Sequence, residues 1–130
     1  NALMRVKSNI DSGLSQAIQE MGIEALSLSQ EWLDSNNDIY KKRRDKVVST
    51  LKEIGLDALA PKATLYIWTK VPEGYTSASF TERLLEDVNV VVTPGNGYGS
   101  AGEGYIRLSL TIPDDQIDEG LRRLSQFTVS

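Results

Sequence analysis

The sequence predicts an α+β fold in which a small three-stranded sheet is covered by helices, in the order α-α-β-α-β-β-α. Two patterns support this. Apolar residues three and four positions apart, typical of amphipathic helices, dominate residues 12–54 and recur after residue 112. Runs rich in β-branched and aromatic residues occupy 63–71, 88–94 and 105–112. With 130 residues, no internal repeat and no dividing linker, the chain is expected to form one domain, 1–130.

The first helix is expected from about residue 12 to 33, with Asp11 or Ser12 as its cap. Its apolar stripe follows the helical period. The residues of this stripe are Leu14, Ile18, Met21, Ala25, Leu28 and Trp32.

The segment DSNN (34–37) is expected to break that helix and to offer Asn37 or Asp38 as the cap of a second one. Gly55 is suited to end the second helix, because glycine readily adopts the left-handed conformation found after helix C-termini. The buried stripe of this helix is predicted to be Tyr40, Val47, Leu51 and Ile54.

The first strand is predicted at 63–71, and a turn follows it. Ser79 and Glu82 have the spacing of a capping box, which predicts a helix bearing Phe80, Leu84, Leu85 and Val88. A second strand is expected at 88–94, where a continuous apolar run suggests burial on both faces.

The third strand is predicted at 105–112, after a glycine-rich loop. Pro113 and two aspartates are expected to open the last helix, which carries Ile117, Leu121 and Leu124. Arg122 and Arg123 lie near its C-terminal end, where the helix dipole favours cations.

Composition excludes several kinds of chemistry. The chain has no cysteine and no histidine, which excludes disulfides, Cys/His zinc sites, cysteine nucleophiles and Ser-His-Asp triads within it. A net charge of −4 gives no broad basic surface for nucleic acid. No apolar run is long enough to span a bilayer, and no signal-peptide pattern opens the chain. The start at Asn1 suggests a piece of a longer protein.

The glycine-rich loop contains Gly97, Gly99 and Gly102 in the spacing G-x-G-x-x-G of dinucleotide-binding proteins. That fingerprint requires a helix after the loop and an acidic residue about 20 positions later. Here a strand follows, and Arg122 and Arg123 occupy that later position, so NAD binding is not expected. Two interpretations stay open: a flexible connection, or a loop whose backbone a ligand or another chain approaches closely.

Arg107 stands alone in an alternating strand, YIRLSLT. The alternation points Ile106, Leu108 and Leu110 one way and Tyr105, Arg107, Ser109 and Thr111 the other. Arg107 then either lies on a solvated face, where Glu103 is a nearby candidate partner, or binds a carboxylate through two parallel hydrogen bonds. The residues alone leave both alternatives open.

Five segments together resemble one enzyme family, in family order across the whole chain: 6–13, 40–48, 61–72, 79–99 and 102–113. They are similar to the C-terminal region of class I/II aminotransferases, which are fold-type I enzymes dependent on pyridoxal 5′-phosphate. Within that family the likeness is to LL-diaminopimelate and aspartate aminotransferases. The resemblance implies that residues 1–130 are the small domain of a cytoplasmic, homodimeric transaminase of amino-acid biosynthesis, here lysine biosynthesis.

The resemblance also assigns roles. Arg107 falls where the family binds the α-carboxylate of its substrate. Asn9 corresponds to a loop that reaches toward the neighbouring subunit's site; it either makes a polar contact there or is an ordinary asparagine at a helix start. Tyr98 either forms a wall of the site or is a packing aromatic. The basic run KKRR (41–44) matches a family pattern on a helix surface and is not expected to be a localisation signal.

No catalytic residue and no cofactor-binding residue is expected in this chain. The seven lysines lie in segments that match other parts of the family, so none corresponds to the lysine that forms a Schiff base with the cofactor. The cofactor, the amino-acid and 2-oxo-acid substrates and the large domain would meet only in the longer enzyme, and this piece alone is expected to be inactive. The alternative is a stand-alone regulatory or interaction module that binds an amino acid. Neither interpretation involves nucleic acid, membrane or metal.

Overall fold

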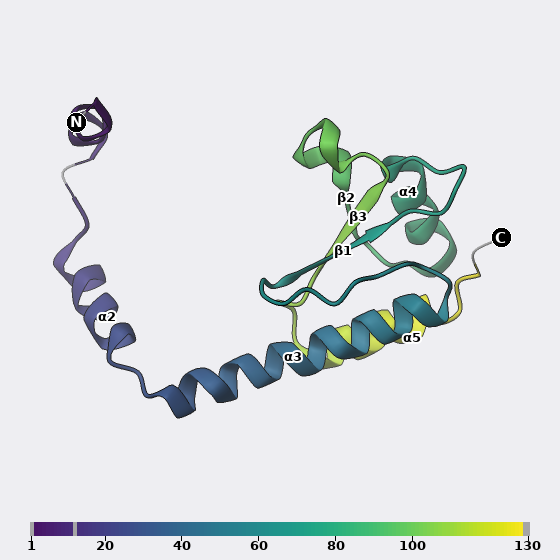
Figure 1. The fold of residues 1–130 in the computed structure, drawn as a ribbon, viewed down its shortest axis with the longest axis horizontal. Coiled ribbons are helices and arrows are strands. Elements are labelled where there is room, and N and C mark those ends of the chain that lie inside the picture. The colour runs from purple at the N-terminus through teal and green to yellow at the C-terminus, as the bar shows by residue number, and fades with distance from the viewer. Residues whose placement is uncertain (1, 12, 129–130) are drawn as a thin grey trace. The chain divides into compact units, whose positions relative to one another are not determined.

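The computed structural model describes residues 2–11 and 13–128, which fall into two compact units, 1–36 and 37–130. The order of elements in the described residues is α-α-α-β-α-β-β-α, one helix more than predicted. The predicted class, a small sheet with helices, is confirmed (Figure 1). Among the helices of this described part, none is both long and apolar enough to cross a membrane.

The first unit contains α1 (Ala2–Ile10), α2 (Gln16–Leu26) and the beginning of α3 (Gln30–Glu53). The single helix predicted over 12–33 is therefore wrong. Ser15 has an extended backbone before α2, and the chain leaves the helix at residues 27–29. The Asp11 carboxylate accepts a hydrogen bond from the Gly13 N–H and does not cap α2, while Ser12 lies outside the described residues.

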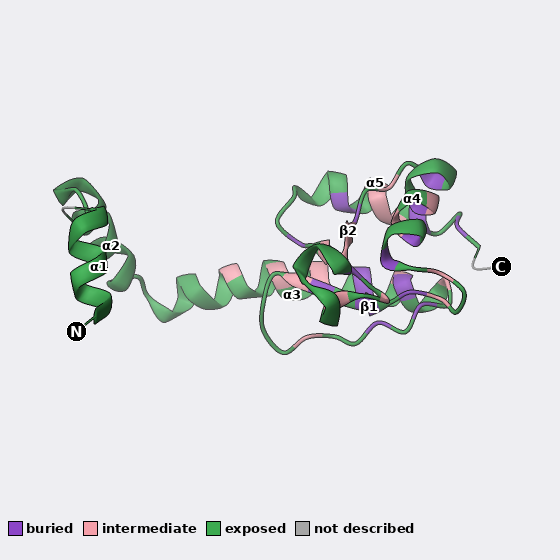
Figure 2. Cartoon of the chain, turned by 90° about the horizontal axis from the view of Figure 1, so that it is seen from above, coloured by how far each residue is buried: buried purple, intermediate pink, exposed green. Residues whose placement is uncertain are grey.

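No described residue of this first unit is buried, and its apolar side chains are exposed (Figure 2). The apolar residues of the predicted stripe do not lie on one helix, because Leu14 precedes α2, Leu28 lies between α2 and α3, and Trp32 is on α3; within the unit they pack into no core.

Helix α3 continues through DSNN, so the predicted break at 34–37 and the cap at Asn37 or Asp38 are wrong. The helix begins earlier, where the Ser29 hydroxyl accepts the Trp32 N–H at 3.2 Å. Asp and Asn inside a helix cost only a few tenths of a kcal/mol each, which is too little to break it. The N-terminal boundary of α3 is therefore set by the cap at Ser29, whose carbonyl accepts the Leu33 N–H.

The sheet of the second unit has the order β1-β3-β2 and is antiparallel throughout. It consists of β1 (Tyr66–Lys70), β2 (Thr93–Pro94) and β3 (Tyr105–Ser109). All three strands are shorter than predicted. The largest difference is in β2, because α4 extends to Val88 and Asn89 ends that helix in the left-handed conformation. Arg107 lies at the centre of the sheet, paired with Trp68 on β1 and Thr93 on β2.

Helices α3, α4 (Ser77–Val88) and α5 (Asp114–Leu124) enclose the core with the sheet. The N-terminal cap of α4 is a box of Thr76 and Ser79, so the predicted box of Ser79 and Glu82 is wrong by one turn. The core residues are Val47, Val48, Leu51, Leu56, Ala58, Ile67, Val71, Phe80, Leu84, Val88, Val92, Ile106, Leu110, Ile117, Leu124 and Phe127.

Two ion pairs join α3 to α5 where the helices lie side by side (Figure 1). Arg43 Nε contacts Asp114 at 2.6 Å, and Lys46 contacts Asp118 at 2.7 Å. The Arg43 guanidinium also donates to the carbonyl of Leu110. The basic run at 41–44 therefore includes Arg43, whose ion pair with Asp114 joins α3 to α5.

Candidate functional site

The central strand β3 has one face in the core and one outside it. Ile106 is fully buried and Leu110 nearly so, whereas Arg107 is only partly buried, which confirms the predicted alternation. Since Trp68 is the register partner of Arg107, these two side chains share the outer face. Tyr66, two residues before Trp68, projects on that face as well.

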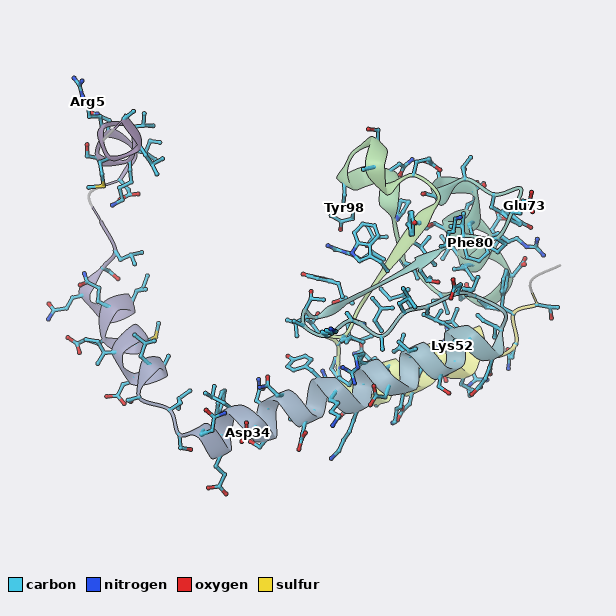
Figure 3. All side chains as sticks on the ribbon, viewed as in Figure 1. Arg5, Asp34, Lys52, Glu73, Phe80 and Tyr98 are labelled. Atoms are coloured by element: carbon cyan, nitrogen blue, oxygen red, sulfur yellow. The ribbon has the colours of Figure 1, made fainter. Side chains whose placement is uncertain are left out.

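The Arg107 guanidinium lies between two tyrosine rings. Its central carbon is 4.0 Å from the centroid of the Tyr66 ring and 4.3 Å from that of Tyr98. Trp68 meets Tyr98 edge to face, with 5.5 Å between ring centroids. Both Arg107 distances are well within the roughly 6 Å at which a cation is attracted to an aromatic face. Figure 3 labels Tyr98 close to the strands and well separated from Lys52 on α3.

The charge of Arg107 has no acidic partner among the described residues, 2–11 and 13–128. Its Nε is buried and makes no hydrogen bond there. Glu103, the candidate partner on the solvated face, does not pair with Arg107. That carboxylate instead accepts the N–H of Ser77 at 2.8 Å and of Gly104 at 3.1 Å.

The bond from the Ser77 N–H is the main reason why the pKa of Glu103 is lowered. Glu103 therefore stays ionised at the N-terminus of α4, where backbone N–H groups favour an anion. Its charge is therefore engaged at the helix end and not at the guanidinium of Arg107.

The glycine-rich loop folds into two short 3-10 turns, Gly95–Tyr98 and Ser100–Gly102. The backbones of Gly95 and Gly102 touch, since a Cβ on either glycine would collide with the carbonyl of the other. The close backbone contact found here is thus within the loop itself, and the approach of a ligand or another chain stays a prediction. Gly97, by contrast, has open space around it.

Ser77 holds the far end of this loop in place. Its fully buried hydroxyl accepts the N–H of Gly104 at 2.9 Å and of Tyr105 at 3.1 Å, and it donates to the carbonyl of Gly102 at 3.3 Å. The loop is therefore anchored at its base, and Tyr98 at its tip packs on Arg107.

Asn9 lies in the last turn of α1, not at a helix start, in the first unit. Its side-chain amide donates to the carbonyl of Arg5 at 2.6 Å, within its own helix. Its contact with substrate stays a prediction.

Sequence reasoning missed Tyr66 and Trp68. The signal was present, because strand alternation over 63–71 places both on one face. What was lacking was the antiparallel register, which sets Trp68 opposite Arg107.

Comparison with protein families gives one match: the model described as aminotransferase class I and II covers residues 1–124. An LL-diaminopimelate aminotransferase of Dehalococcoides mccartyi (strain CBDB1) is 58% identical over 130 residues, which is all of this chain and 34% of that protein. Another from Moorella thermoacetica is 51% identical over 123 residues, 95% of this chain and 32% of that protein. The chain thus spans about a third of the length of these curated relatives.

Solved structures agree with the sequence comparison. Apo-BacF from Bacillus subtilis has a TM-score of 0.84 at 32% identity, over 98% of this chain and 33% of that one. An L,L-diaminopimelate aminotransferase from Chlamydomonas reinhardtii has a TM-score of 0.81 at 33% identity, over 94% of this chain and 30% of that one.

Proposed function

This chain belongs to the class I and II aminotransferase family, and we propose that residues 1–130 are the small, substrate-binding domain of a longer enzyme of that family. The longer enzyme would transfer an amino group between an L-amino acid and a 2-oxo acid. LL-diaminopimelate is the favoured amino acid, because the relatives at 58% and 51% identity carry that name. The homodimer and the cytoplasmic location are further parts of the proposal that rest on the family likeness.

The family uses pyridoxal 5′-phosphate. The described residues do not fit that cofactor by themselves. The side chains that contact the Arg107 guanidinium are those of Tyr66 and Tyr98. Among the described residues, no acid forms an ion pair with it and no lysine contacts it. The cofactor and the residues that hold it are therefore assigned to the part of the enzyme outside this chain.

The observation that carries the proposal is the Arg107 guanidinium, which is held between two rings and pairs with no acid in the described residues. A guanidinium on a rigid strand is suited to bind the planar carboxylate shared by amino acids and 2-oxo acids. Holding that carboxylate would orient the substrate, and closure of the domain would exclude water from it.

The test is the Arg107→Ala substitution in the full-length enzyme. A lost charge-assisted hydrogen-bond pair corresponds to a KM increase of about 10- to 100-fold. The increase is expected for amino acid and 2-oxo acid alike, since both present the same carboxylate. Arg122→Ala is the matched control, because Arg122 is exposed and contacts only Glu119 among the described residues. An Arg107→Ala enzyme with wild-type KM would remove the proposed role.

The isolated chain gives a second test. Residues 1–130 alone should show no transamination. Calorimetric titration with glutamate, aspartate and diaminopimelate should show no tight binding. Saturable binding by the isolated chain would instead support the alternative, an amino-acid-binding module that acts on its own.

A further inference from the structure

The two tyrosines that enclose Arg107 come from distant parts of the chain. Tyr66 is the first residue of β1, where the ladder with β3 fixes it opposite Ser109. Tyr98 ends the first turn of the glycine-rich loop and is half exposed. One ring is therefore part of the sheet, while the other reaches Arg107 only because the loop folds back.

Two contacts set the position of the Tyr98 ring. The backbone of Gly95 lies against that of Gly102, which closes the loop that carries Tyr98. The Trp68 ring then meets Tyr98 edge to face at an angle of 71°. Tyr98 is thus supported on one side by the sheet and covers Arg107 on another.

The burial of the Arg107 side chain limits which of its nitrogens a ligand can reach. Nε is buried and has no hydrogen-bond partner in the described residues. Neither terminal nitrogen of Arg107 is both buried and unpartnered. A carboxylate that approaches this guanidinium must therefore use the two terminal nitrogens, as a side-on approach through Nε is closed.

We propose that Tyr98 and Tyr66 are positioning residues, which hold the Arg107 guanidinium so that its two terminal nitrogens bind the substrate carboxylate end-on. This inference rests on the proposed function. A free arginine side chain loses rotamer entropy when it is ordered. A guanidinium already held between two rings has lost that freedom before the substrate arrives, so a larger part of the interaction free energy contributes to substrate affinity.

The experiment compares Tyr98→Leu and Tyr98→Phe in the full-length enzyme. Leucine removes the aromatic face, and the KM for amino acid and 2-oxo acid should rise about tenfold, with kcat changed much less. Phenylalanine keeps the ring and should restore a KM near that of wild type. As a readout independent of turnover, the calorimetric Kd for glutarate, a dicarboxylate without an amino group, should follow the same order.

Tyr40→Leu is the matched control. Tyr40 also stacks on an arginine, with its ring centroid 5.4 Å from the central carbon of Arg43, but it lies on α3 and its arginine is not Arg107. This variant should keep the wild-type KM and glutarate Kd. Equal losses in Tyr40→Leu and Tyr98→Leu would show that destabilisation alone raises KM, and the positioning role would be refuted.

Arg107→Ala separates this inference from the proposed function. If Arg107→Ala raises KM and Tyr98→Leu does not, the positioning role fails while the carboxylate role stands. If Arg107→Ala leaves KM unchanged, the proposed function fails first. If Tyr98→Phe is as poor as Tyr98→Leu, the phenol hydroxyl matters and the ring does not, which also overturns the inference.

Discussion

A single methyl group in the glycine-rich loop should destabilise this protein at one position and not at another two residues away. A Cβ on Gly95 would overlap the carbonyl oxygen of Gly102 and lie 2.7 Å from that of Tyr105. Gly97, in the same turn, has no atom within 4 Å of such a Cβ and does not need a positive φ. Gly95→Ala and Gly97→Ala are therefore a matched pair with opposite expected outcomes.

The magnitude follows from what must move. Both atoms that a Cβ on Gly95 would meet belong to the backbone, so no side chain can rotate away from it. Overpacking of this kind costs about 1–3 kcal/mol, and we expect about 2 kcal/mol for Gly95→Ala. Gly97→Ala should be neutral or stabilising by up to about 1 kcal/mol, because alanine lowers the entropy of the unfolded chain.

The assay is urea unfolding of the chain followed by circular dichroism, with the slope of the transition checked for constancy. For a unit of this size, a loss of about 2 kcal/mol corresponds to a fall in Tm of about 10 °C. If Gly95→Ala and Gly97→Ala unfold at the same urea concentration, the close backbone contact of Gly95 with Gly102 does not exist in solution.

Three further predictions concern other positions. Ser77→Ala should lower the free energy of unfolding by about 2 kcal/mol, because the Tyr105 N–H loses the fully buried Ser77 hydroxyl that accepts its part-buried hydrogen bond; Ser49→Ala, on the surface of α3, should change the free energy of unfolding by under about 0.5 kcal/mol. Hydrogen bonds from Arg122 and Arg123 lower the pKa of Glu119 to about 2, below its usual 4.5, so the stabilisation from these pairs is complete above pH 4.5 and is lost as the pH falls toward 2. An NMR titration of the Glu119 carboxyl should show that pKa, and Arg122→Ala should move it upward; a midpoint near 4.5 in the unsubstituted protein would contradict the hydrogen bonds. Gly120→Ala should raise the free energy of unfolding by about 0.5–1 kcal/mol, and the urea midpoint with it, since the glycine is inside α5 with open space around it. A lower midpoint would mean that a neighbour fills that space.

The boundaries of helices were the least predictable part of the fold. DSNN has weak helix formers, yet α3 passes through it, and α4 is capped by Thr76 rather than by Ser79. The competing local preferences differ by tenths of a kcal/mol to about 1 kcal/mol, so the cap at Ser29, and not the composition of DSNN, sets where α3 begins.

The candidate site was predictable in part. Alternation in YIRLSLT placed Arg107 on the face opposite Ile106, and the structure confirms that placement. Tyr98 was named from the sequence as a wall of the site or a packing aromatic, but its contact with Arg107 depends on the fold of the loop. Tyr66 was not predictable, because it is 41 positions from Arg107 and reaches it only through the register of the sheet.

The sequence by itself determined the class of fold, the family and the direction in which Arg107 points, because hydrophobic period and residue order are local properties of the chain. Only the tertiary structure decided what surrounds that guanidinium. Its contacts with Tyr66 and Tyr98 join residues separated by 41 and 9 positions, and non-local contacts of this kind form only when the sheet register and the Gly95–Gly102 contact are in place.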